Sequence, residues 1–240
     1  MKNNEYSPLW PHSEIKQVFP TIFYVTGTNI TIHNDIEFQH SRNMIIIRDN
    51  NQLSLINTVK LNDQGLSRLD SLGHVENIIR IGAFHGRDDA FYLDRYKAKL
   101  WALEGMQHQN NRHADVFLTP NGKMPFTYCS FFNFETSAHP EGILHIATDG
   151  GILVTCDSIK NWISADPFFS PDTAKLYKEQ GFFGVATISA VWKETCHVQA
   201  SDFARLKLLK FKHLVSAHGE PLLNNAYEAA TKTIEKEYGI

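Results

Sequence analysis

The chain has few of the features that direct a protein out of the cytoplasm. It has only three cysteines among 240 residues, at positions 129, 156 and 196. An odd number of widely spaced cysteines does not suit a disulfide framework and favours a reducing compartment. The opening "MKNNEYSPLWPHSE" lacks the apolar centre of a signal peptide, and no apolar run approaches the roughly 20 residues of a membrane span. We therefore expect a cytoplasmic protein with no membrane partner.

An excess of basic charge is also absent. The chain has 23 basic and 26 acidic residues and a net charge of −3. It has no basic stripe with interleaved aromatic residues, so we expect no nucleic-acid partner. It also lacks low-complexity segments, internal repeats and linkers rich in proline, glycine or serine. Residues 1–240 are therefore predicted to form a single domain, long enough to bury a sizeable core.

What the sequence does contain is a mixture of strand and helix patterns. Apolar runs rich in β-branched and aromatic residues predict strands at 22–29, 75–84, 98–103, 124–134 and 213–219, and hairpins at 43–61 and 142–157. Capping residues followed by spaced apolar positions predict helices at 62–73, 88–96, 170–180, 201–211 and 222–239. The fold class is therefore α/β or α+β, with helices covering sheets.

Ligand-type side chains follow three of these apolar strands. "IIRIGAF" runs into His85, "ILVTC" into Asp157 and "LVSA" into His218, while His139 opens a hairpin within "SAHPEG". Loops beyond the carboxyl ends of strands are the usual place for a site in an α/β fold. A divalent metal needs several imidazole or carboxylate ligands that converge from different loops. This pattern favours a metal site.

Each of these residues also has a structural interpretation, which the sequence leaves open. Asp88 and Asp89 suit the N-terminus of the helix that follows them. Asp157 and His218 suit turns after buried strands. Cys156 neighbours Asp157, so in an extended strand its side chain points to the opposite face, and we expect a buried, inert thiol.

The order of these motifs resembles the metallo-β-lactamase-fold hydrolases over most of the chain. Asn57 stands in a hairpin segment where the family often has an aspartate. "HGRDDA" (85–90) corresponds to the family's His-x-His-x-Asp-His, and "AHPEG" (138–142) to its Gly-His-Thr-x-Gly segment. "TCD" (155–157) and "AHG" (217–219) correspond to its later strand ends. The resemblance implies a four-layer αββα sandwich, with two sheets face to face and helices on both outer sides.

Carried over position by position, the resemblance implies a set of metal ligands. One metal site would keep His85 and His139, and the other would keep Asp89 and His218. Asp157 would lie between them as a bridging carboxylate. Asp89 and Asp157 would be the catalytic carboxylates.

Two positions depart from the family pattern. Arg87 and Ala90 stand where the first motif has its second and third histidines. A guanidinium group stays charged and cannot coordinate a metal, and alanine has no donor atom. We expect Arg87 to lie in the pocket and to pair with Asp89 or Asp157. The site is therefore predicted to hold at most one metal, with zinc favoured over iron or manganese.

Two functions follow from this interpretation. The first is a hydrolase of reduced metal content that acts on a small molecule containing an ester, lactone, amide or thioester. The second is a metal-free, catalytically inactive relative that binds a small molecule or a protein partner in the same pocket. The sequence does not distinguish them, and it does not determine the substrate or the oligomeric state.

Overall fold

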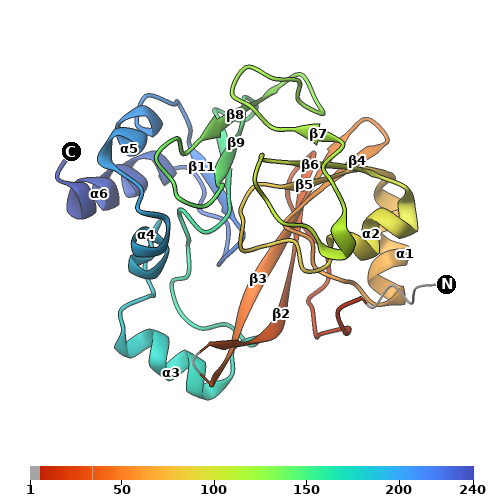
Figure 1. The fold of residues 1–240 in the computed structure, drawn as a ribbon, viewed down its shortest axis with the longest axis horizontal. Helices are drawn as coiled ribbons and strands as arrows, with labels where there is room; N and C mark the ends of the chain where they lie inside the picture. Colours follow the sequence, from red (N-terminus) through yellow and green to blue (C-terminus); the bar gives the residue numbers. More distant parts are fainter. Residues whose placement is uncertain (1–5, 34) are drawn as a thin grey trace.

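Two β-sheets form the centre of the protein in the computed structural model, which describes residues 6–33 and 35–240. The larger sheet has the order β1-β2-β3-β4-β5-β6-β7 and the smaller β11-β10-β9-β8 (Figure 1). The larger sheet comprises β1 (Lys16–Phe19), β2 (Ile22–His33), β3 (Ile36–Asp49), β4 (Gln52–Ile56), β5 (His74–Arg80), β6 (Lys99–Ala102) and β7 (Val116–Phe117). The smaller comprises β8 (Cys129–Asn133), β9 (Gly142–Ile146), β10 (Ile152–Thr155) and β11 (His213–Ser216).

Helices cover the outer face of each sheet. On the larger sheet these are α1 (Asp63–Leu72) and α2 (Asp89–Tyr96); on the smaller they are α4 (Ala190–Cys196), α5 (Ala200–Leu206) and α6 (Ala226–Tyr238). A further helix, α3 (Pro171–Glu179), lies beside the long β2–β3 hairpin, and a single 3₁₀ turn, η1 (Gln109–Asn111), follows β6 (Figure 1). This arrangement confirms the predicted four-layer fold. None of the helices in the described ranges is long and apolar enough to cross a bilayer.

The run "MIII" in β3 shows how the sequence produces these layers. Ile45 and Ile47 face the core between the two sheets, while Met44 and Ile46 face the helices on the outer side. Successive side chains of a strand point to opposite faces, so a strand buried on both faces is apolar at every position. The continuous run therefore belongs to a central strand of a sheet that is covered twice.

Local capping explains where two of the predicted helices begin. The side chain of Asn62 accepts a hydrogen bond from the backbone N–H of Gly65 at 2.8 Å. Ser170 caps α3 in the same way, and Pro171 occupies its first turn. The sequence predicts Ser170 as a cap and leaves Asn62 and Asp63 as alternatives for α1, of which Asn62 is the cap in the structure. The short helix α4 was not predicted from the sequence.

Two aspartates near the starts of helices have structural roles other than capping. Asp88 precedes α2, but its carboxylate pairs with the buried guanidinium of Arg42 and makes no cap bond. The sequence leaves Ser201 and Asp202 as alternative caps, yet α5 begins at Ala200 and Asp202 lies inside it. Its buried carboxylate instead accepts hydrogen bonds from the backbone of Glu135 and Thr136 at 3.1 and 2.9 Å. In both cases a distant partner outcompetes the local N–H groups.

The ends of three strands define the place of the candidate site. β10 and β11 are parallel, so the segments that follow them leave the same edge of the smaller sheet. A hydrogen bond of 2.7 Å from the backbone N–H of Asn43 to the carbonyl of Ala217 ties that edge to β3. β5 ends at Arg80, earlier than the predicted residue 84, so residues 81–88 form a loop that brings His85 to the same place.

Candidate active site

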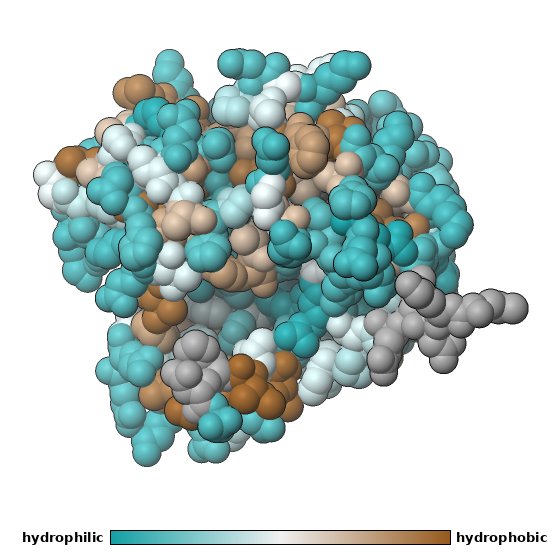
Figure 2. All heavy atoms as spheres, in the orientation of Figure 1, coloured by the Kyte–Doolittle hydropathy of each residue, from teal (hydrophilic) through white to brown (hydrophobic). Residues whose placement is uncertain are grey.

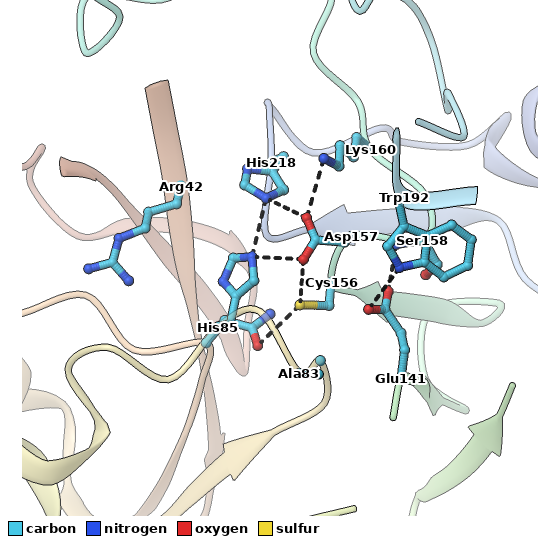
Figure 3. Close-up of polar contacts among 12 residues, drawn as sticks. Arg42, Ala83, His85, Glu141, Cys156, Asp157, Ser158, Lys160, Trp192 and His218 are labelled. Atoms are coloured by element: carbon cyan, nitrogen blue, oxygen red, sulfur yellow. Dashed lines mark hydrogen bonds and ion pairs between the residues drawn. The ribbon is translucent and has the colours of Figure 1, made fainter. Parts of the chain in front are cut away.

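Three of the five predicted ligand residues meet where these strands end (Figure 3). The Nε2 atoms of His85 and His218 are 3.2 Å apart. The Asp157 carboxylate contacts both rings, with Oδ2 3.3 Å from His85 Nε2 and Oδ1 3.1 Å from His218 Nε2. All three side chains are largely buried, with 7%, 11% and 3% of the His85, Asp157 and His218 side chains exposed.

The tautomer of His218 follows from its second contact. Its Nδ1 lies 3.1 Å from the carbonyl oxygen of Ser41. A carbonyl oxygen can only accept a hydrogen bond, so Nδ1 carries the proton. Burial, followed by the charge of Lys160, lowers the pKa of His218 to about 3, so the ring is neutral. The lone pair of Nε2 therefore points toward Asp157 and His85.

The carboxyl group of Asp157 is ionised despite its burial. Burial alone raises its pKa, but the charge of Lys160 and contacts with His85 and His218 hold that pKa well below the usual value. Lys160 Nζ lies 3.3 Å from Asp157 Oδ1 and stands over the ring of Trp162. Sequence reasoning missed Lys160, which follows Asp157 by three residues.

The donor set fits a single metal ion. His218 Nε2 and Asp157 Oδ1 are both acceptors, and two lone pairs that face each other at 3.1 Å favour a cation between them. Neighbouring ligand atoms of a tetrahedral zinc ion lie roughly 3.3 Å apart for zinc–nitrogen bonds of about 2.0–2.1 Å. The separations of 3.1 to 3.3 Å among the three groups match this value. Three protein ligands also leave an open position for water.

Cys156 lies at the base of the same cluster. It is fully buried, as expected, and burial, followed by Asp157, raises its pKa well above the usual value for a thiol. Its Sγ is nevertheless 3.8 Å from Asp157 Oδ2 and close enough to His85 to belong to one potential metal-binding group. The alternation argument that pointed it to the other face fails because β10 ends at Thr155.

Asp89 does not join the cluster. Its Oδ1 accepts a hydrogen bond of 2.6 Å from Thr58 Oγ1, and its Oδ2 is buried without a hydrogen-bond partner. Burial raises the pKa of Asp89, although Thr58 and the nearby guanidinium of Arg80 lower it. In the described ranges, the group of potential ligands around His85 comprises Cys156 and Asp157 and contains neither Asp89 nor His139.

His139 is exposed, with its ring against that of Phe84 at a centroid distance of 5.2 Å. Backbone contacts fix the position of His139 outside the cluster. Gly82 forms an isolated antiparallel β-bridge with Glu141, and the N–H of Ala83 donates a hydrogen bond to the carbonyl of Pro140 at 3.0 Å. Glu141 points inward instead and accepts hydrogen bonds from the backbone N–H of Ser158 and from the indole of Trp192. Burial, followed by Asp157, raises the pKa of Glu141 to about 8. Sequence reasoning missed this residue.

Arg87 lines the cleft, and it pairs with neither Asp89 nor Asp157. Lys160 pairs with Asp157, and Thr58 holds Asp89. Arg87 is half-buried, and burial and the neighbouring Arg42 lower its pKa. Its guanidinium takes part in no hydrogen bond, ion pair or ring contact with any residue that the structure describes, although the charge of Asp88 acts on it and partly offsets this lowering of the pKa.

The cluster lies at the bottom of a cleft with two connected parts. The inner part has a volume of about 230 Å³ and contains Arg87, Asp157 and His218 in its wall. The outer part, of about 530 Å³, shares Asp157, Lys160 and three aromatic residues with it. Figure 2 shows this face of the molecule hollowed between the lobe of α3 and the β2–β3 hairpin and the rest of the protein. Such a cleft suits a small molecule.

Comparison with solved structures identifies the fold. The DIM-1 metallo-β-lactamase exposed to ceftazidime is 13% identical, with a TM-score of 0.60 over 95% of this chain and 99% of that one. The mono-zinc form of the FIM-1 metallo-β-lactamase from Pseudomonas aeruginosa is 12% identical, with a TM-score of 0.60 over 95% and 96%. A metallo-β-lactamase from Pontibacter korlensis is 11% identical, with a TM-score of 0.58 over 93% and 99%.

The protein is thus a divergent chain with the metallo-β-lactamase fold. The sequence itself matches the model of no protein family and no curated protein. At this level of identity the likeness establishes the fold, while the chemistry has to be argued from the residues of the site.

Proposed function

We propose that the protein is a hydrolase that uses one metal ion held by His85, Asp157 and His218. The observation that carries this proposal is the convergence of two imidazole Nε2 atoms and one carboxylate within 3.1 to 3.3 Å of one another. The fixed tautomer of His218 adds to it, since a backbone carbonyl that holds Nδ1–H is the usual partner of a metal-ligating histidine.

The chain's own groups suit the hydrolysis of an ester, lactone, amide or thioester. A bound zinc ion lowers the pKa of a water molecule to about 7, which supplies a nucleophile at neutral pH. Asp157 and His218 hold fixed positions at the bottom of the cleft. The ammonium group of Lys160 faces the cleft beside Asp157, where it can donate a hydrogen bond to the oxygen of a substrate carbonyl.

One ion is proposed rather than two. A second ion would need the ligands His139 and Asp89, of which the first is exposed and the second is enclosed beside Thr58. Arg87 and Ala90 remove two further ligand positions, and the guanidinium repels a dication. The proposal therefore assigns catalytic and metal-binding roles to Asp157 but none to Asp89.

The test is elemental analysis of untagged protein after dialysis, for zinc, iron and manganese, since two histidines and one carboxylate also suit iron. We expect about one equivalent of metal per chain, and at least a tenfold loss of affinity in His85→Ala and His218→Ala. His139→Ala is the matched control and should retain the metal. Two equivalents, or loss of metal in His139→Ala, would contradict the proposal.

A second candidate function is a metal-free relative that binds a small molecule in the cleft. The ion pair of Lys160 with Asp157 favours it, because the ammonium supplies the positive charge that a metal would otherwise provide. In that case the purified protein contains no metal, and Lys160→Met allows metal to bind where the unmodified chain does not. Equal metal content in the two proteins would exclude this role for Lys160.

A further inference from the structure

The inner part of the cleft carries more positive than negative fixed charge. Arg42, Arg87, Lys160 and Asp157 all line it. Arg42 is neutralised by its buried pair with Asp88, and Lys160 by Asp157 at 3.3 Å. The guanidinium of Arg87 is left over. A positive charge without an ion-pair partner among the described residues thus lines a pocket of about 230 Å³, and Asp88, already paired with Arg42, opposes it only in part.

Half-burying an unpaired cation costs free energy, because the group loses part of its hydration without gaining a partner. A cation that faces a pocket regains this free energy when an anion binds there. The five N–H donors of a guanidinium lie in one plane, so they match the two oxygens of a carboxylate better than a compact ammonium does. A single unpaired charge suits a ligand with a single negative charge.

The remaining wall of the cleft is aromatic. Phe84, Trp162 and Tyr177 line both the inner and the outer part. Phe84 is 53% exposed at the rim, so its ring is accessible to a ligand in the cleft. The outer part, of about 530 Å³, continues past Ile188 and Trp192. An apolar group attached to the anion would therefore lie against rings rather than in water.

We propose that this cleft binds a small organic monocarboxylate, with its charged end on Arg87 and its apolar body along Trp162 and Tyr177. At position 87, where the metallo-β-lactamase-fold hydrolases have a metal-ligating histidine, this chain then has an arginine that binds an anion. If the proposed hydrolase activity holds, the substrate carries such a carboxylate besides the bond that is cleaved. Only that last statement rests on the proposed function, because the binding itself needs no metal.

The test is calorimetric titration of protein dialysed against EDTA with 3-phenylpropionate and hexanoate, each compared with its neutral amide. We expect both carboxylates to bind at least about tenfold more tightly than their amides. Arg87→Gln should weaken carboxylate binding about tenfold and leave amide binding unchanged, and Arg87→Lys should give an intermediate affinity. Arg68→Gln, at an exposed position on α1, is the matched control.

Equal affinity for carboxylates and amides would overturn the inference, as would undiminished binding in Arg87→Gln. Tighter binding of phenyl phosphate than of 3-phenylpropionate would overturn the assignment to a monoanion. Carboxylate selectivity in a protein that takes up no metal would support the inference while the metal proposal fails. One equivalent of metal without carboxylate selectivity would support the metal proposal and overturn the carboxylate inference.

Discussion

His40 lies behind the candidate site, with its ring stacked on that of Tyr177 at a centroid distance of 5.8 Å and against that of His218 at 5.7 Å. Burial lowers the pKa of His40 from 6.5 to about 4, with a smaller contribution from Lys160 in the same direction. The ring is therefore neutral in the folded protein at neutral pH. An unfolded chain would protonate it at a higher pH.

This difference predicts a pH-dependent stability. Between pH 6.5 and about 4 the unfolded chain binds a proton at His40 that the folded chain does not, so the free energy of unfolding falls as pH is lowered. We expect this residue to contribute about 3 kcal/mol to the loss. Denaturant unfolding in EDTA should show a smaller loss for His40→Phe than for the unmodified chain. His113→Phe, at an exposed position, is the control, and an identical loss in all three proteins would argue against the prediction.

Among single residues, the ends of apolar strands were the predictable part of the site. Asp157 and His218 follow buried strands, and both lie in the cluster. Lys160 and Glu141 were not predicted, because a lysine in a loop or a glutamate near a hairpin has no local pattern that marks it as buried. Their roles arise from partners elsewhere, such as Trp162 and Trp192.

At the scale of elements, the loop between β5 and α2 determines the position of His85. The guanidinium of Arg80 holds this loop by donating hydrogen bonds to the carbonyls of Gly82 and Ala83 at 3.3 and 2.5 Å. Gly86 follows His85 with a φ of +101°. A Cβ at Gly86 would lie 2.7 Å from Arg80 Nε and 2.8 Å from Asp89 Oδ2.

Gly86→Ala is therefore expected to displace the loop and weaken metal binding. Gly181→Ala is the matched control, because Gly181 also has a positive φ, +70°, but a Cβ there would meet nothing within 4 Å. The control should cost about 1 kcal/mol from backbone strain, and Gly86→Ala about 2 to 3 kcal/mol because steric overlap adds to the strain. Thermal unfolding and metal titration of both variants measure this. Equal losses of stability and of metal affinity in the two variants would mean that Arg80 and Asp89 move to make room for the added methyl group.

Longer elements were predicted better than short ones. The strand predicted at 98–103 and the helices predicted at 62–73 and 170–180 appear at their expected places, whereas only Cys129–Asn133 of the strand predicted at 124–134 is a strand. The short helix α4, "AVWKETC", has too few turns for a periodic pattern, and packing of Trp192 and Cys196 onto the smaller sheet stabilises it instead. β5 ends before the apolar residues Ile81 to Phe84, because Arg80 holds them in a loop.

At the scale of the whole molecule, the two sheets share one hydrophobic core and are joined by hydrogen bonds. The side chain of Asn43 in β3 donates to the carbonyls of Ser216 and Gly219 at 3.0 and 2.6 Å, across the two sheets. Trp101 lies in the core between the sheets, and Trp192 lies under the helices of the smaller one. Neither sheet can lose its partner without exposing an apolar face.

We therefore predict that the chain forms one domain and unfolds in one cooperative transition. Tryptophan fluorescence and far-ultraviolet circular dichroism should give the same denaturation midpoint in EDTA. If the metal proposal holds, free metal at 100 times its dissociation constant should raise the free energy of unfolding by about 2.7 kcal/mol. Two separate transitions, with a proteolytic cut between the halves, would contradict the single domain.

The sequence by itself determined most of the strands and helices and the residues at the strand ends, because alternation, capping and turn chemistry act over a few neighbouring positions, while the four layers were implied by the family resemblance. Only the tertiary structure decided which of the five expected ligands meet. Asp89 is held by Thr58, and the backbone around Gly82 leaves His139 outside. Whether two side chains lie 3 Å or 10 Å apart depends on contacts between segments distant in the chain, which no local pattern records.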